Sequence, residues 1–216
     1  MSQNPPNLID LDAFDESQHP RGKTTDQSTP GSFAPKDAGL TKEERHSEAW
    51  DEWESTLTDL EVDTMQTYLG TAYIRINEFL RSGLPAVSED DKKSAEEAKI
   101  IDGMLSRAPG WPGTSYRGMG LSPQQAIEFT NTKIIEMKAF TSTAETRQIA
   151  KGFLWGGLQP VATFVRVQGK HGVIVNAFGG DEGEILFKTG TRFRVTIDKS
   201  DLKSSKPSMT MTWKEI

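Results

Sequence analysis

The spacing of apolar residues changes near the middle of this 216-residue chain. Between residues 41 and 110, apolar side chains recur every three to four positions, which is the period of an α-helix. After residue 110 the apolar segments become short, contain many β-branched residues and end near glycines, as in PVATFVRVQG and TRFRVTID. A series of helices followed by a series of strands predicts an α+β fold. We therefore expect a helical lobe over residues 41–110 and a β-rich core over residues 111–216.

Capping residues and glycines set the expected ends of several helices. A helix in TDLEVDTMQTYLGTAYIRINEFLRSG is expected to have a possible break at Gly70 and an end at Gly83. A further helix, in SEDDKKSAEEAKIIDGMLSRAPG, is expected to begin after Ser88 or Ser94. SPQQAIEFTN predicts a short helix, because it combines a serine cap, proline at the first helical position and a glutamine that closes a capping box.

The second half of the chain is expected to consist mainly of strands. One short helix is expected in AETRQIAKGFLW. The expected strands are TSYRGMG, KIIEMKAFTST, PVATFVRVQG, GVIVNAFG, EILF, TRFRVTID and PSMTMTWKEI.

Residues 1–40 differ in composition from both halves. They are rich in Pro, Ser, Thr, Asp and Gln, and their few apolar residues cannot repay the entropy cost of ordering the segment. We expect a disordered N-terminal arm that is followed by one folded domain over residues 41–216.

Composition also narrows the class of protein. The formal net charge is −6, whereas binding to nucleic acid usually requires a basic surface. The chain has no cysteine and only three histidines, which argues against thiolate or histidine-rich metal sites. No apolar run approaches the length of a membrane span, and the N-terminus lacks a signal-peptide pattern. We expect a soluble protein with no metal, no nucleic-acid partner and no membrane partner.

Two glutamates stand next to an apolar segment in DEGEILF, at positions 182 and 184. If both belong to a strand, Glu182 and Glu184 point to the same face, because side chains alternate with a period of two. Two carboxylates on one face repel each other unless a cation lies between them. A solvated, charged turn before a strand is the ordinary interpretation of this pattern when it stands alone.

Two further features of the second half carry chemically useful side chains. Arg117 is followed by Gly118, and an arginine beside a permissive backbone suits an oxyanion such as phosphate. FTSTA places hydroxyl groups at a strand end, where Ser142 and Thr143 can brace another polar group. Taken singly, each is more typical of an ordinary surface arginine or an ordinary strand.

Together, in this order and spacing, the features resemble the arginine-type branch of the mono-ADP-ribosyltransferases. SYRGMG is similar to the family's arginine motif, AFTSTA to its Ser-Thr-Ser motif, and DEGEILFKTGTRFRV to its Glu-x-Glu motif. YLGTAYIRINEFLR is similar to the helix that precedes the arginine motif. The resemblance covers roughly residues 41–216. One position departs, because Ala144 stands where the motif has its last serine, while Ser142 is kept.

This resemblance implies a mixed or antiparallel β-sandwich core and NAD as an ADP-ribose donor, with no metal. It implies that Glu184 hydrogen-bonds the ribose 2′-hydroxyl and stabilises the ribosyl cation, and that Ser142 holds the Glu184 carboxylate. Arg117 would bind the pyrophosphate, the Gly118 backbone would contact the nicotinamide amide, and Thr143 would lie among the residues that contact NAD. The chain has no GxGxxG dinucleotide fingerprint, which agrees with a donor role for NAD.

Four more residues receive roles from the same resemblance. Phe153 or Trp155 would stack on nicotinamide. Glu182 would orient an incoming guanidinium and take its proton. Relatives that modify asparagine or cysteine carry glutamine at this position, so Glu182 implies an arginine target. Phe178, in the loop before the glutamates, is expected to contact the target protein.

Several alternatives to an arginine-specific transferase remain at this point. Water can replace arginine, which would make the chain an NAD glycohydrolase. A catalytically inactive domain that binds NAD or a partner, or a structural protein that interacts through its acidic helices, is also compatible with the composition. The polar N-terminal arm resembles the leader of bacterial effectors that are injected into other cells, and a phage-encoded enzyme is the other possibility. An immunity protein or a secretion chaperone is a further expected partner; without export, the chain would be cytoplasmic.

Overall fold

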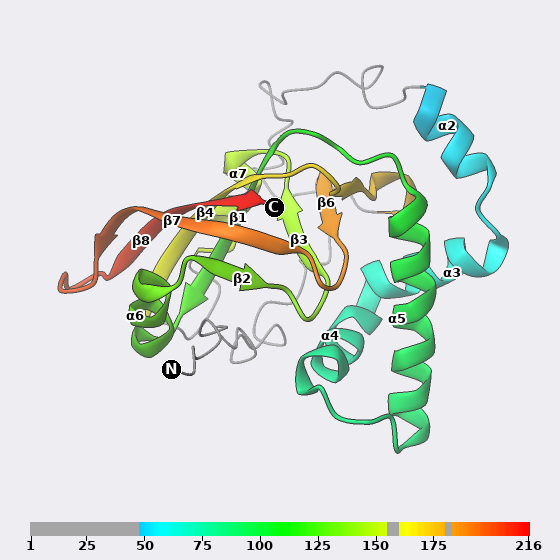
Figure 1. Cartoon of the computed structure of the whole chain (residues 1–216), viewed down its shortest axis with the longest axis horizontal. Helices are drawn as coiled ribbons and strands as arrows, with labels where there is room; N and C mark the ends of the chain where they lie inside the picture. The colour runs from blue at the N-terminus through cyan, green and yellow to red at the C-terminus, as the bar shows by residue number, and fades with distance from the viewer. Residues whose placement is uncertain (1–47, 155–159, 180–182) are drawn as a thin grey trace, which may run out of the picture.

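The structure is a computed structural model that describes residues 48–154, 160–179 and 183–216 (Figure 1). The expected arm, residues 1–40, lies outside this part. The helices come first along the chain and most of the strands come last, as the apolar periodicity predicted, so the α+β class is confirmed. The lobe comprises α2 (Glu48–Ser55), α3 (Asp59–Thr67), the π-helix η3 (Tyr68–Ala72), α4 (Tyr73–Ser82) and α5 (Glu89–Arg107). The core comprises β1 (Thr114–Leu121), α6 (Pro123–Asn131), β2 (Ile134–Glu136), β3 (Thr141–Ala144), α7 (Arg147–Gly152), β4 (Val161–Gln168), β5 (Val173–Ile174), the 3-10 helix η4 (Asn176–Phe178), β6 (Glu184–Phe187), β7 (Arg192–Asp201) and β8 (Ser208–Glu215).

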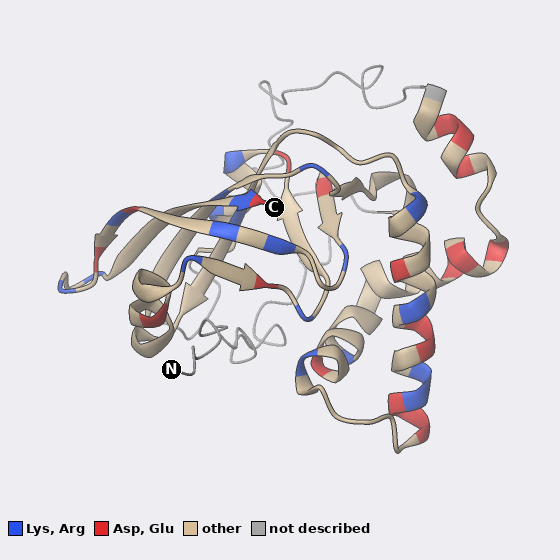
Figure 2. Cartoon of the chain, viewed as in Figure 1, with Lys and Arg blue, Asp and Glu red and all other residues tan. Residues whose placement is uncertain are grey.

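Local capping fixes the helix ends in the lobe. Ser88 is the N-cap of α5: its hydroxyl accepts from the Asp91 N–H at 3.1 Å, and the Asp91 carboxylate accepts from the Ser88 N–H at 3.1 Å. The end of α4 at Gly83 is also as predicted, because this residue has a left-handed φ of 61°. Figure 2 shows that acidic residues are frequent along α2, α3 and α5.

The predicted break at Gly70 is a π-helical segment, and the chain remains helical through it. Residues 68–72 widen the turn between α3 and α4. Such bulges insert into a helix without ending it, and they often lie near functional sites. Here the bulge buries Tyr68 fully, and its hydroxyl accepts a 3.1 Å hydrogen bond from the Asn77 side chain.

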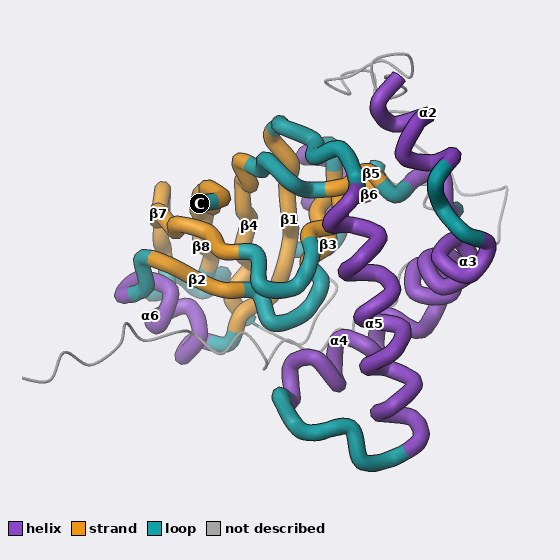
Figure 3. Tube along the Cα trace, turned by 45° about the vertical axis from the view of Figure 1, so that its right-hand side comes forward, coloured by secondary structure: helices purple, strands orange, loops and turns teal. Residues whose placement is uncertain are grey.

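The eight strands form one hydrogen-bonded series in the order β2-β7-β8-β4-β1-β3-β6-β5 (Figure 3). All pairs are antiparallel except β4 with β8, so the sheet is mixed, as expected. Strand β1 pairs with β4 over eight residues but with β3 at only one, Tyr116 with Ala144. The sheet therefore has two parts, β2-β7-β8-β4-β1 and β3-β6-β5, that meet at this pair.

One face of the larger part carries the apolar core. Trp213 of β8 is fully buried and stacks on Phe129 of α6 at 6.1 Å between ring centroids. Phe193 of β7 packs against Trp213 at 5.6 Å and against Phe187 of β6 at 5.3 Å. Helix α6, which begins at the predicted Ser122 capping box, thus covers the core side of the sheet.

The structure corrects two predicted strands. KIIEMKAFTST forms two strands, because β2 pairs with β7 near one end of the sheet while β3 pairs with β1 and β6. Residues 137–140 leave the strand conformation and carry the chain between these places. GVIVNAFG contains only the two-residue β5, and the 3-10 helix follows at Asn176. Apolar alternation shows which segments can be extended, but not where a strand changes partners.

Side-chain contacts join the lobe to the core. Trp53 of α2 packs edge-on against Phe178 at 6.0 Å, and Tyr68 packs against Phe140 at 5.4 Å. Asp102 of α5 accepts hydrogen bonds from the backbone and side chain of Thr189, at 3.0 and 2.9 Å. These contacts attach the segments before and after β6 to the helices, so the lobe supports the strand that begins at Glu184.

Candidate active site

Three neighbouring strands bring together the arginine, the serine and the second glutamate. Arg117 lies in β1, Ser142 in β3, and Glu184 at the start of β6. These strands are adjacent in the order β1-β3-β6, although residues 117 and 184 are far apart in sequence. The juxtaposition depends on long-range strand pairing, and local sequence does not determine it.

The register of β3 with β6 places Ser142 and Glu184 on the same face. Ala144 is opposite Glu184, and Ser142 is opposite Leu186. Opposite residues share a face, and so do residues two positions apart, which makes Ser142 a diagonal neighbour of Glu184. Diagonal neighbours lie about 7–8 Å apart, within reach of a long side chain such as glutamate.

Arg117 is fixed by a hydrogen bond to the serine's backbone. Its Nη1 donates to the carbonyl oxygen of Ser142 at 2.6 Å. The side chain is partly buried, so the guanidinium is held at a defined place beside β3. A guanidinium offers five donors in a planar fork, which suits an anionic ligand.

Glu184 is 8% exposed, and its backbone is fixed on two sides. Its N–H donates to the Oδ1 of Asn176 at 2.9 Å, and its carbonyl accepts from the Val175 N–H at 3.0 Å. No role for Asn176 was predicted from the sequence. The only signal in the sequence was a polar residue directly after the apolar run that ends at Val175.

The strand alternation that was used to place Glu182 is observed only from Glu184 onward. Strand β6 begins at Glu184, and Gly183 before it has a left-handed φ of 58°. Glu182 itself lies outside the described residues, so its same-face position stays a prediction.

A third glutamate, Glu145, lies against the same turn, and no role for it was predicted from the sequence. It is 8% exposed, and its N–H donates to the carbonyl oxygen of Gly183 at 2.8 Å. A Cβ on Gly183 would come within 2.8 Å of the Glu145 Oε2 and within 3.0 Å of its Cβ. Gly183 is therefore required for two reasons, its backbone conformation and this side chain.

Gly118 is explained by packing against α7. A Cβ at this position would overlap the carbonyl oxygen of Ala150 and approach the Leu154 nitrogen at 3.3 Å. The glycine thus lets α7 lie directly on β1. Packing against α7 is enough to explain why residue 118 is a glycine. The expected contact between the Gly118 backbone and nicotinamide therefore stays a prediction.

Thr143 braces the three strands from inside. Its hydroxyl oxygen lies 2.8 Å from the Ser115 hydroxyl oxygen and 3.0 Å from the Ile185 carbonyl oxygen, and the residue is 3% exposed. These contacts link β3 to β1 and to β6. The geometry supports a structural role for Thr143 and gives no separate support for a contact with NAD.

The expected aromatic residues differ in their surroundings. Phe178 is 6% exposed and packs on Trp53, so the structure places it in the core, not on an exposed loop that meets a target. Phe153 is the C-cap of α7 and is partly exposed, which leaves its expected stacking role open to test. Trp155 lies outside the described residues.

Neither a metal centre nor a membrane span is found in residues 48–154, 160–179 and 183–216. No group of three or more His, Asp or Glu side chains in that part has the geometry to hold a metal ion. No described helix is both long and apolar enough to cross a bilayer.

Comparison with known proteins gives one family and several similar folds. The family model described as ADP-ribosyltransferase exoenzyme matches residues 43–212. No curated protein matches the chain in sequence.

Three of the similar solved structures are bacterial proteins. One is the ADP-ribosyltransferase Vis of Vibrio splendidus, solved in complex with agmatine, with a TM-score of 0.62 and 20% identity over 83% of this chain and 90% of that chain. Another is the toxin Plx2a of Paenibacillus larvae, with a TM-score of 0.59 and 17% identity over 78% and 91%. The third is the type III effector XopAI of Xanthomonas axonopodis pv. citri, with a TM-score of 0.59 and 19% identity over 77% and 66%. At these identities the likeness shows a shared fold.

Proposed function

Since the chain belongs to the ADP-ribosyltransferase exoenzyme family, we propose that it cleaves NAD and transfers the ADP-ribose to an arginine side chain of a target protein. ADP-ribosyltransferases use NAD as their substrate. The proposal therefore concerns the acceptor of the ADP-ribose and the roles of the catalytic and NAD-binding residues. The observation that carries it is the adjacency of Arg117, Ser142 and Glu184 on three paired strands, with Arg117 Nη1 bound to the Ser142 carbonyl at 2.6 Å.

In the proposed reaction, the bond between the ribose C1′ and the nicotinamide nitrogen breaks, and nicotinamide leaves with the bonding electrons. Positive charge develops on the ribose, and a fixed carboxylate stabilises it best where the surroundings contain little water. Glu184 supplies that carboxylate, since it is almost fully buried and its backbone is fixed by Asn176. Arg117 binds the pyrophosphate through its fork of N–H donors, and Ser142 orients the Glu184 side chain.

Glu182 is proposed to select the acceptor. A guanidinium is always protonated in proteins, so it needs a base to become a nucleophile. Glu182 would accept that proton while the arginine nitrogen attacks C1′. The solved complex of Vis with agmatine, a guanidine compound, supports an acceptor of this chemistry for a protein of the same fold.

The test combines labelled NAD with agmatine and measures nicotinamide release together with ADP-ribosyl-agmatine. The expected outcome is agmatine-dependent product whose yield does not change when EDTA is added. Release of nicotinamide without any adduct would instead identify an NAD glycohydrolase. Failure to bind NAD in calorimetry would instead favour a structural protein that interacts with a partner through its acidic helices.

The domain and its context are proposed in the same way. We propose that residues 41–216 suffice for NAD cleavage, because every proposed site residue lies there; loss of activity after removal of residues 1–40 would contradict this. The toxin and effector relatives support a role in which the enzyme enters another cell and modifies a protein there. Labelled NAD incubated with host lysates, followed by mass spectrometry, would identify the modified residue.

A further inference from the structure

Charge is divided unevenly between the two halves of the molecule. Residues 48–110 contain 14 acidic and 6 basic residues, a formal charge of −8. Residues 111–216 contain 9 acidic and 14 basic residues, a formal charge of +5. In Figure 2 basic residues are frequent on the strands of the sheet, whereas acidic residues prevail on the long helices. The β-rich core is thus a cationic part of an anionic chain.

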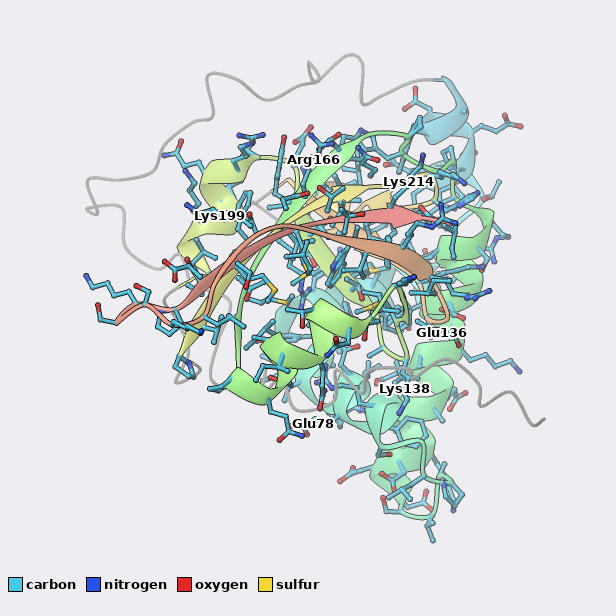
Figure 4. The ribbon with its side chains drawn as sticks, turned by 60° about the vertical axis from the view of Figure 1, so that its left-hand side comes forward. Glu78, Glu136, Lys138, Arg166, Lys199 and Lys214 are labelled. Carbon is cyan, nitrogen blue, oxygen red and sulfur yellow. The ribbon has the colours of Figure 1, made fainter. Side chains whose placement is uncertain are left out.

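Part of this positive charge lies on one exposed face of β4, β8 and β7, here called the outer face. It carries the exposed side chains of Arg166, Arg192, Arg194 and Lys214. Their neighbours along the strands, such as Val165 and Trp213, point to the core instead. Figure 4 labels Arg166 and Lys214 on the side of the sheet away from α6, the helix that covers the core side.

Strand register brings like charges together on the outer face. Arg194 is directly opposite Lys214, and Arg166 is opposite Thr212, which makes Arg166 a diagonal neighbour of Lys214. Like charges that are directly opposite in a sheet destabilise the pairing. The facing cations therefore lower the stability of the sheet, and the packing of the sheet does not explain why they are there.

Little negative charge offsets this repulsion. Within the described part of the chain, Arg166, Arg194 and Lys214 form no ion pair, and Arg192 has only a long one, 3.8 Å from the Glu136 carboxylate. Asp198 lies nearby in β7 and accepts a hydrogen bond from Thr212 at 2.9 Å. An external anion would lower the electrostatic repulsion between these cations. This reduction would contribute to the free energy of binding.

We propose that the outer face is a docking surface for an acidic segment of a partner polypeptide. Arg192 and Arg194 are two positions apart along β7, which separates them by about 6.6–6.8 Å. An extended segment with acidic residues at every second position has the same spacing. The four cations are confined to the outer face. A short acidic segment can bind there without approaching the acidic helices of the lobe.

Nucleic acid and anionic membrane fit this face less well. A long polyanion would also meet the field of a chain whose net charge is −6. The aromatic rings on this face, Tyr116 and Phe164, stack on each other at 5.8 Å, and the guanidinium of Arg147 lies over Tyr116 at 5.3 Å. Within the described residues, both rings therefore already have a stacking partner, which disfavours the base stacking that single-stranded nucleic acids require.

The experiment measures the binding of a fluorescent oligoglutamate peptide to the full chain by anisotropy at two salt concentrations. The wild-type chain should bind the peptide, and more weakly at high salt. The double variant Arg194→Glu, Lys214→Glu should lose about tenfold or more in affinity, a change of about 1.4 kcal/mol or more. The control Lys203→Glu, Lys206→Glu changes the net charge equally in the segment between β7 and β8, and its affinity should change less than about twofold.

Several outcomes would overturn the proposal. They are no peptide binding by the wild-type chain, an equal loss in the control variant, or tighter binding of an oligothymidylate of equal charge or of phosphatidylserine vesicles. Salt-sensitive self-association that the double variant abolishes would assign the face to a second copy instead.

A neutral variant separates binding from folding. Arg194→Gln, Lys214→Gln removes the like-charge pair, so it should melt at the same or a higher temperature than wild type while it binds the peptide more weakly. A lower melting temperature would show that the two cations stabilise the sheet. This would contradict the claim that Arg194 and Lys214 repel each other and lower its stability. None of these readouts depends on NAD cleavage, so the result does not depend on the proposed activity.

Discussion

The helical lobe and the β-rich core are organised over different distances along the chain. In the lobe, helix ends are fixed by residues three positions apart, as in the boxes of Thr58 with Glu61 and Ser88 with Asp91. In the core, the candidate site depends on pairing between strands that are remote in sequence, so that Ala144 lies opposite Glu184. We therefore expect substitutions in the core site to change chemistry, and substitutions in the lobe to change stability only.

The largest expected effect concerns Glu184, the buried carboxylate of the core. Glu184→Gln keeps the shape of the side chain but removes its charge. It should lower both NAD hydrolysis and transfer to agmatine by about 100- to 1000-fold, which is typical of losing one electrostatic contact in a transition state. Nicotinamide release and adduct formation check this, with circular dichroism as the folding control. Activity retained in this variant would contradict the whole site assignment.

Glu182→Gln should separate the two reactions. If Glu182 serves only the incoming guanidinium, the variant should lose transfer to agmatine while it keeps appreciable NAD hydrolysis, because water needs less assistance once the ribosyl cation forms. The ratio of adduct to nicotinamide is the measurement. Equal losses of both activities would show that Glu182 and Glu184 do not have separate roles in NAD cleavage and in transfer to the acceptor.

Two glycine substitutions compare the core with the lobe directly. Gly118→Ala should destabilise the fold by about 1–3 kcal/mol, because its new methyl group would overlap the Ala150 backbone. Gly103→Ala in α5 meets no atom within 4 Å and should stabilise the fold by about 0.5–1 kcal/mol. Urea denaturation of both variants gives the difference. A neutral Gly118→Ala would show that α7 does not lie tightly on β1.

Features that depend on residues close together in the sequence could be predicted, whereas features that depend on long-range strand pairing could not. The cap at Ser122 and the end at Gly83 were read from neighbouring residues, and both agree with the structure. The possible break at Gly70 marks an irregularity, but the chain stays helical there as a π-helical turn. The site residues were found only through resemblance to a family, because no local pattern shows that β1, β3 and β6 are neighbours.

The failures have the same cause. The strand predicted for KIIEMKAFTST changes partners at residues 137–140, and its alternation gives no sign of this. Glu145 and Asn176 escaped notice because each contacts the turn or backbone around Glu184 across the sheet. Phe178 was expected to contact a target protein because it stands in the segment before the two glutamates, yet it is 6% exposed and packs on Trp53 of α2.

A smaller effect is expected where a core residue only orients the site. Asn176→Ala removes the acceptor for the Glu184 N–H, and it should reduce stability by about 1 kcal/mol. Because Glu184 acts in the transition state, kcat for nicotinamide release should fall while the KM for NAD stays nearly constant. Asn176→Asp keeps an acceptor oxygen and should restore most of kcat. A rise in KM alone would assign Asn176 to substrate binding.

The smallest expected effect lies in the lobe, at Glu61. Burial alone would raise the pKa of this carboxyl, but hydrogen bonds from the Thr58 backbone and from Arg107, the latter at 2.6 Å, outweigh it, so the pKa lies below the ordinary value of 4.5. A lowered folded-state pKa means that the stabilisation is present above the unfolded pKa and disappears as the pH falls through the folded value. Glu61→Gln should therefore cost less than about 1 kcal/mol at neutral pH, and progressively less at an acidic pH as the folded-state carboxyl becomes protonated. Urea denaturation at both pH values measures the difference, and NAD cleavage at neutral pH should be unchanged. A change in kcat would contradict the separation of lobe from core.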